Sequence, residues 1–262
     1  MLRIIDARTG EAVVAAPVRR GLTRVQAHAS GYGTGALRVL LVTDVLVRAL
    51  ELGGTPVWAL LTGERQQAEL RAGAAALGMH PFEDGQDLGA GVGEAQVLHV
   101  VGEGAPAPDG VRVAVAPVTG SAGPSDPDGP RPPGAAPTGP AVPRPALPAD
   151  PSVLRLALLS RPRTEPVHLE AALLSEAHET LVRWRGAVAG WARRPSRPVP
   201  DEVRGRLRNA WEDDLDVPEM LRVLRWAEDA GPELPDGARF ETYAYADRLL
   251  GLELTRDVGA PA

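Results

Sequence analysis

Residues 24–61 read RVQAHASGYGTGALRVLLVTDVLVRALELGGTPVWALL, and this stretch decides the fold. Its first five residues predict a short strand, and residues 37–52 predict a nearly all-apolar helix that Gly53-Gly54 ends as a C-cap. Residues 56–61 then predict a buried strand. A strand, a helix and a second strand in this order make a crossover unit, and such units build parallel sheets.

The same alternation continues on both sides of this stretch. Further strands are predicted at residues 2–5, 96–101 and 111–116, and a further helix at residues 64–77 with Gly78 at its end. We therefore expect an α/β fold class, with a Rossmann-like parallel sheet in a nucleotide-binding-type domain over residues 1–117.

A proline-rich segment follows this domain. Residues 117–151 contain twelve prolines spaced by Gly, Ala, Ser and Asp, so the segment has little apolar area to offset the entropy of ordering it. We expect an extended or disordered linker over residues 118–149. This segment would divide the chain into two domains.

After the linker the pattern is helical, and we expect an α-helical bundle over residues 150–262. Asp150 is placed to cap the first helix, with Pro151 in its first turn. Asp216 and Glu219 have the spacing of a capping box at the start of a later helix. The helices are expected at residues 151–159, 167–191, 200–211, 217–230 and 238–252.

Composition excludes several kinds of chemistry. All 28 basic residues are arginine and there is no cysteine, which excludes a Schiff-base or P-loop lysine, a thiol nucleophile and a cysteine-ligated metal. The net charge of −6 argues against a general nucleic-acid binder. Because the chain has no signal-peptide pattern and no apolar run of membrane-spanning length, we expect a cytoplasmic protein with no membrane partner.

Five segments resemble, in the same order, the cysteinyl branch of class I aminoacyl-tRNA synthetases and its cysteine-ligase relatives of mycothiol synthesis. They are LRIIDARTGEAV (2–13), GTGALRVLLVTDVLVRALELGG (33–54), RAGAAALGMHP (71–81), ADPSVLRLALLSRPRTEPVHLEAALLSEA (149–177) and NAWEDDLDVPEMLRVLRWA (209–227). The resemblance implies a truncated class I synthetase nucleotide domain followed by a helical bundle. It also implies ATP-dependent activation of an amino acid, which needs donors that neutralise the phosphates in the transition state.

The resemblance places the HIGH-type motif of that family at residues 33–38. Gly35 stands at the family's glycine and Arg38 at its basic residue, but Gly33 and Ala36 stand where imidazoles are expected. A glycine-rich loop entering a helix can cradle an anion, but without a lysine this pattern is more typical of a tight turn from strand to helix. Both interpretations stay open.

A surviving ligand site is expected at this loop, with an ATP- or AMP-type nucleotide as its ligand. Its residues would be Ser30, Gly31, Gly33, Thr34, Gly35 and Arg38, with His28 close by. His99 lies in an apolar strand, where a histidine satisfied within the core is the expected state. No catalytic residue is assigned.

Other parts of the family's machinery have no counterpart in this sequence. The KMSKS lysines are absent, and the linker supplies only Arg131 and Arg144 at that place. The first zinc cysteine would fall near Arg24, so zinc is not expected. No anticodon-binding module is evident, so tRNA is not expected as a partner.

Three functions remain open from the sequence. The first is a non-catalytic paralogue of cysteinyl-tRNA synthetase, a pseudoenzyme with residual binding of a nucleotide or an aminoacyl-adenylate-like ligand. The second is a divergent ATP-dependent ligase that activates a carboxylate with Arg38, Arg24 or the linker arginines. The third is an interaction module whose bundle or proline-rich segment binds a protein partner.

Overall fold

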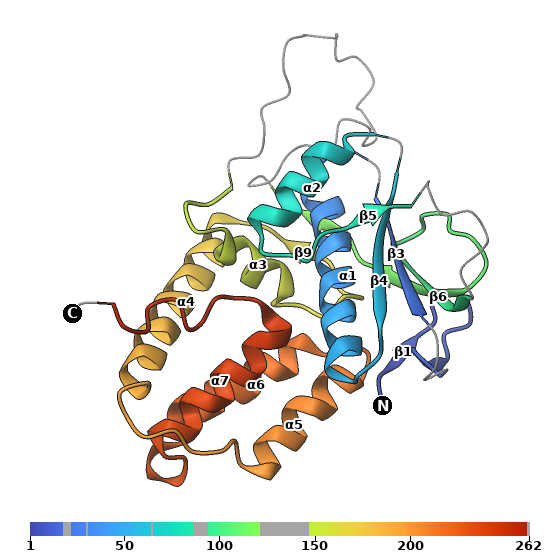
Figure 1. Cartoon of the computed structure of the whole chain (residues 1–262). Coiled ribbons are helices and arrows are strands. Elements are labelled where there is room, and N and C mark those ends of the chain that lie inside the picture. Colours follow the sequence, from blue (N-terminus) through green and yellow to red (C-terminus); the bar gives the residue numbers. More distant parts are fainter. Residues whose placement is uncertain (18–21, 30, 64, 86–93, 121–146, 261–262) are drawn as a thin grey trace, which may run out of the picture.

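The computed structural model of the chain describes residues 1–17, 22–29, 31–63, 65–85, 94–120 and 147–260. A five-stranded parallel sheet lies against helices, and a helical region follows it (Figure 1). The α/β fold class with a Rossmann-like sheet and a helical region is confirmed. Within the described ranges, no helix combines the length and the apolar character needed to cross a bilayer.

Most predicted elements form with small shifts at their ends. Residues 167–168 were expected to begin a helix but form a strand that pairs with residues 118–119, and the strands at residues 12–14, 83–84 and 118–119 were not predicted. The strands are β1 (Arg3–Ile5), β2 (Ala12–Val14), β3 (Leu22–His28), β4 (Val57–Thr62), β5 (Glu83–Asp84), β6 (Glu94–Gly102), β7 (Val111–Val115), β8 (Val118–Thr119) and β9 (Val167–His168). The helices are α1 (Thr34–Leu52), α2 (Gln67–Ala76), α3 (Pro151–Leu159), α4 (Ala171–Trp191), α5 (Asp201–Glu212), α6 (Val217–Asp229) and α7 (Asp236–Leu250), with a 3-10 turn, η1 (Gly231–Glu233).

The order of strands in the sheet is β5-β4-β3-β6-β7. From β3 the chain passes through α1 to β4 and through α2 to β5, and then returns to β6 on the other side of β3. The strand β1 does not join this sheet. It pairs antiparallel with β2, so the strand expected at residues 2–5 forms but lies in a separate two-stranded ribbon.

The helix α1 lies at the centre of the molecule (Figure 1). It packs on β3, β4 and β6 of the sheet and also contacts α2 and α7. A helix covered on several sides must be apolar around its circumference, and the sequence of α1 meets this requirement. This position of α1 joins the sheet to the C-terminal helices.

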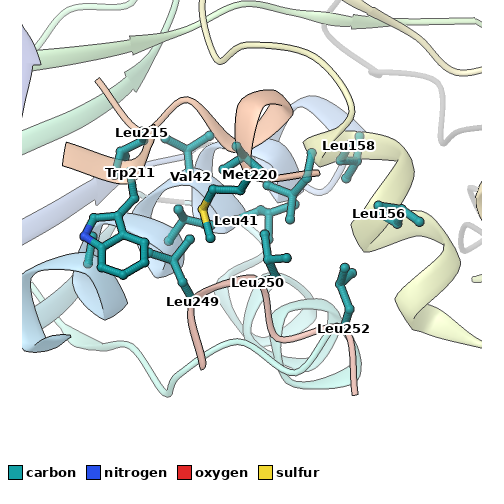
Figure 2. Packing of buried hydrophobic residues seen from close by; sticks show 14 of the residues in the cluster. Leu41, Val42, Leu156, Leu158, Trp211, Leu215, Met220, Leu249, Leu250 and Leu252 are labelled. Carbon is teal, nitrogen blue, oxygen red and sulfur yellow. The ribbon is translucent and has the colours of Figure 1, made fainter. Parts of the chain in front are cut away.

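Both halves of the chain contribute to one hydrophobic core. Figure 2 shows its central residues, which come from α1, α3, α5, α6, α7 and the segments beside them: Leu41, Val42, Leu156, Leu158, Trp211, Leu215, Met220, Leu249, Leu250 and Leu252. Residues 121–146 of the expected linker lie outside the described residues. The division into two domains stays a prediction, and the described parts on its two sides are packed together.

Both predicted helix caps are confirmed. The Asp150 carboxylate accepts a hydrogen bond from the amide of Ser152 at 3.0 Å, in front of α3. The Asp216 carboxylate accepts one from the amide of Glu219 at 2.9 Å, in front of α6. Each cap satisfies an amide that the first helical turn leaves without an intrahelical acceptor.

A buried carboxylate on α1 holds several segments together. Asp44 is fully buried, and its Oδ2 accepts from Arg155 Nη2 at 2.6 Å and from Arg48 Nε at 2.9 Å. Its Oδ1 accepts from the His80 amide at 2.9 Å and lies 2.8 Å from His80 Nδ1. Burial disfavours the ionised form, but the hydrogen bonds from His80 and the charges of Arg155 and Arg48 outweigh it and lower the pKa of Asp44.

The guanidinium of Arg155 extends this network to two further segments. Its Nη1 donates to the carbonyl of Leu77 at 2.9 Å, and its Nε donates to the carbonyl of Leu250 at 2.6 Å. The next residue, Gly251, has a φ of 60°, and a Cβ placed there would lie 2.8 Å from Arg155 Nη2. Arg155 therefore joins α1, the end of α2 and the end of α7 at one point.

Replacing Asp44 by alanine is expected to lower the free energy of unfolding by about 3–5 kcal/mol, because Arg155 would keep a buried charge without its partner. Urea denaturation followed by circular dichroism measures the change. The control is Arg204→Ala, which removes an exposed ion pair with Asp201 and should change stability by less than about 1 kcal/mol. Equal effects of the two substitutions would contradict this account of the core.

Candidate functional site

The order of the strands points to one edge of the sheet as a ligand site. The chain continues from β3 to one side through α1 and later reaches β6 on the other side, so the strand order reverses between β3 and β6. Open α/β sheets bind ligands at the carboxyl ends of the strands that flank such a point. Here β3 ends at His28, and the glycine loop follows directly.

The described part of the glycine loop is fixed by hydrogen bonds to its neighbours. The amide of Ala29 donates to the carbonyl of Thr62, the last residue of β4, at 3.1 Å. The amide of Tyr32 donates to Gln66 Oε1 at 2.7 Å, and Gly31 has a φ of 77°, which glycine adopts without strain. The loop therefore stays at the carboxyl edge of the sheet.

At the end of this loop, the first turn of α1 has main-chain amides without helical acceptors and two glycines with room for a Cβ. The first helical bond runs from the amide of Leu37 to the carbonyl of Gly33 at 2.9 Å, so the amides of residues 34–36 have no acceptor within the helix. A Cβ placed on Gly33 or on Gly35 would meet no atom within 4 Å. An anion can approach the backbone of this turn closely.

The structure brings most of the expected site residues to this edge. Gly31, Gly33 and Gly35 are partly exposed in the loop and first turn, Thr34 is buried at the first position of α1, and His28 precedes the loop. Ser30 lies outside the described residues. Whether these residues bind a ligand stays a prediction.

Arg38 occupies a different environment from the one expected for a phosphate-binding residue. Its side chain is 1% exposed, and Nη1 donates to the carbonyls of Ala116 at 2.8 Å and Glu165 at 2.7 Å. Nη2 donates to the carbonyl of Pro162 at 2.9 Å. The guanidinium thus connects α1 to two other segments and does not fold back over the first helical turn.

Two residues that sequence reasoning did not place in the site lie against His28. His28 Nδ1 is 2.9 Å from the hydroxyl of Thr62, and His28 Nε2 is 2.9 Å from Nδ1 of His99. Thr62 ends β4 and His99 lies in β6, so the three residues come from adjacent parallel strands. Side chains alternate along β3, and this places His28 on the face of the sheet away from α1. This alternation is the sequence signal that could have pointed to partners of His28 on that face.

Both histidines are neutral near pH 7. Burial, the neighbouring His99 and the charge of Arg112 together lower the pKa of His28 to about 4. Burial also lowers the pKa of His99, although a hydrogen bond to the main chain of Asp109 opposes this. The pair therefore offers uncharged imidazole nitrogens at the carboxyl edge of the sheet.

The residues of this edge do not fit the zinc ion that the family resemblance implies. The sequence contains no cysteine, so no thiolate is present to bind zinc or to share it with a substrate. In the part of the chain that the structure describes, no three histidine or carboxylate side chains are grouped to hold a metal ion.

The sequence is similar to curated cysteine ligases over part of its length, although no family model matches it. It is 39% identical over 108 residues to the L-cysteine:1D-myo-inositol 2-amino-2-deoxy-alpha-D-glucopyranoside ligase of Streptomyces griseus. This match covers 40% of the present chain and 25% of the relative. The ligases of the same name from Parafrankia sp. and Mycolicibacterium smegmatis are 40% and 36% identical over 114 and 109 residues, with the same coverage. The expected resemblance to cysteine ligases is confirmed, and the chain spans about a quarter of the length of these relatives.

The stability of the protein should decrease as the pH falls through the range set by His28. An unfolded histidine titrates near 6.5 and folded His28 near 4, so the unfolded state binds more protons between these values. Relative to His28→Gln, the parent should lose about 1–2 kcal/mol between pH 7 and pH 4, after allowance for partial solvent exposure. Denaturant titrations of both proteins at several pH values measure this difference, and a constant difference would contradict the prediction.

Proposed function

We propose that this protein is a non-catalytic paralogue of the cysteine ligases and cysteinyl-tRNA synthetases. In this proposal the loop between β3 and α1 binds a nucleotide or an aminoacyl-adenylate-like ligand through main-chain amides, and cysteine is not activated. The similarity to the ligases supports the choice of ligand, because an adenylate is the intermediate expected in that family. The composition of the first turn of α1 supports the absence of activation.

One observation carries this proposal. The first turn of α1 offers main-chain amides but no cationic side chain, because Gly33 and Ala36 replace the family's imidazoles and Arg38 donates to carbonyls of other segments. Amides at a helix N-terminus bind an anion in the ground state. Activation also needs donors that stabilise the charge formed in the transition state, and each such donor contributes about 3 kcal/mol.

The alternative of an active ATP-dependent ligase is less well supported by these contacts. It relied on Arg38, Arg24 or the linker arginines to replace the lost imidazoles and lysines. The Arg38 guanidinium donates to carbonyls of two other segments, and Arg131 and Arg144 lie outside the described residues. The interaction-module alternative predicts no binding of small ligands, so the following titration separates it from the proposal.

Calorimetric titration with ATP, AMP and a cysteinyl-sulfamoyl adenosine tests the proposed site. Gly33→Val and Gly35→Val should each lower affinity at least tenfold, because the branched side chain would cover the amides. A Cβ at either glycine meets no atom within 4 Å, so the backbone has room for the first atom of either new side chain. Arg194→Ala, at an exposed arginine that pairs with Asp236 far along the chain, should bind like the parent. The opposite ranking, or no binding by the parent, would overturn the proposal.

The parent protein should also show no cysteine-dependent exchange of pyrophosphate into ATP above the level of a protein-free control. Exchange requires the transition-state donors that the first turn of α1 lacks. Radiolabelled pyrophosphate measures this exchange directly. A turnover of about 1 per second or more, the low end of typical enzymes, would show that cysteine is activated and that the protein is not a pseudoenzyme.

A further inference from the structure

A small cavity lies where α1, α3 and the start of α6 meet. Its volume is about 20 Å³, which is room for one species of about the size of a water molecule. Three of the apolar side chains around it, Val42, Leu158 and Leu215, are labelled in Figure 2. The described polar side chains that line the cavity are all cationic, and they are Arg38, Arg161 and Arg163.

Two of these arginines are buried and lie close to each other. Arg38 Nη1 donates to the carbonyl of Ala116 at 2.8 Å, and Arg163 Nη1 donates to the carbonyl of Ala114 at 2.7 Å. Because the two carbonyls are two residues apart at the end of β7, the two guanidiniums are neighbours. Arg38 is 1% exposed and Arg163 is 6% exposed, so water does not separate their charges.

Each of the two guanidiniums has one donor that no protein group accepts. The Nη groups of both residues bind main-chain carbonyls, but among the described residues neither Arg38 Nε nor Arg163 Nε has a hydrogen-bond partner. A buried N–H group that has lost water and found no acceptor destabilises the native state. Both residues line the same cavity, so one acceptor placed there could serve both N–H groups.

The charges around the cavity favour an acceptor that is negative. Arg163 forms an ion pair with Asp214, but all hydrogen bonds of Arg38 in the described part of the chain go to main-chain carbonyls. Burial lowers the pKa of Arg38 to about 10, against the charge of Glu165, so this guanidinium stays charged at neutral pH. Arg161 adds an exposed positive charge beside it. A buried charge without a counter-charge is strongly disfavoured.

We propose that this cavity binds a small monovalent anion of the halide class, chloride under ordinary conditions, between Arg38 and Arg163. The anion would accept from the two Nε–H groups and compensate the charge of Arg38. A monatomic anion accepts hydrogen bonds from any direction, which suits donors that come from different segments. Sulfate and phosphate are too large for the volume. The site shares only Arg38 with the ligand site expected from the sequence, and it goes beyond the proposed function.

The chain contains a matched control for Arg163. Arg185 is also buried, also binds two main-chain carbonyls and also pairs with one aspartate, Asp150. It differs because its Nε donates to the carbonyl of Glu253 at 3.1 Å, whereas Arg163 Nε has no described partner. Arg163→Gln and Arg185→Gln should both lower stability, because each leaves an aspartate and two carbonyls without their donor. Only Arg163→Gln should also change the response to chloride.

Urea denaturation with chloride replacing gluconate at constant ionic strength tests the proposal. Gluconate is too large for the cavity, so only chloride should bind the native state and raise the denaturation midpoint. The dependence of the midpoint on chloride concentration gives the dissociation constant of chloride. We expect Arg163→Gln to raise this constant at least about tenfold, because a hydrogen bond to a charged group is lost. Arg185→Gln should change it less than about twofold.

Crystals of the parent protein grown in bromide locate the site directly, because bromide scatters X-rays anomalously near its absorption edge. We expect an anomalous peak within hydrogen-bond distance of Arg38 Nε and Arg163 Nε. Equal midpoints of the parent in chloride and in gluconate would overturn the proposal even with such a peak, since the anion would then bind at crystal concentration only. A chloride effect without a bromide peak at this place, or one that Arg163→Gln retains, would also overturn it. If Arg163→Gln does not fold, the two measurements on the parent decide.

Discussion

The pairing of Asp44 with Arg155 inside the molecule constrains everything packed around it. A carboxylate in the middle of a buried helix loses its hydration, and only a full set of donors makes this state tolerable. Asp44 obtains these donors from Arg155, Arg48 and His80, which reach it from other turns and segments. Since Arg155 also holds the ends of α2 and α7, a shift of any of these segments would leave a buried charge without a partner. The packing of the sheet against the C-terminal helices is thereby fixed in one arrangement.

Arginine suits this role better than lysine would. A guanidinium presents five donors in a plane, so it can bind carbonyls of several segments at once, whereas an ammonium group presents three donors from one point. Arg163 binds the carbonyls of Ala114 and Ile5, and Arg185 binds the carbonyls of Leu252 and Glu253. Because all basic residues of this sequence are arginine, its buried basic side chains can each hydrogen-bond to several segments, which lysine side chains could not do in the same way.

The parts of the fold that local sequence determines could be predicted, and those that depend on distant partners could not. The caps at Asp150 and Asp216 formed as expected because each involves residues that lie within three positions. The strand β1 was expected in the parallel sheet but pairs with β2. A segment of three residues is too short for its sequence to indicate which strand it will pair with. In the site, His28 was recognised, but its partners Thr62 and His99 are 34 and 71 residues away. The direction of the Arg38 side chain also depends on carbonyls more than 75 positions along the chain.

The contact between Gly251 and Arg155 restricts how this sequence can change over generations. Residue 251 has a left-handed backbone, and any Cβ there would collide with the guanidinium of Arg155. A side chain at residue 251 has room only after residue 155 has been replaced by a shorter one. That replacement leaves the buried charge of Asp44 without its partner. Residues 44, 155 and 251 can therefore be replaced only in a certain order, and a first replacement at any one of them lowers the stability of the protein. A residue other than glycine at position 251 should therefore occur only where Arg155 and Asp44 have already been replaced, whereas glycine at this position is compatible with either state of that pair.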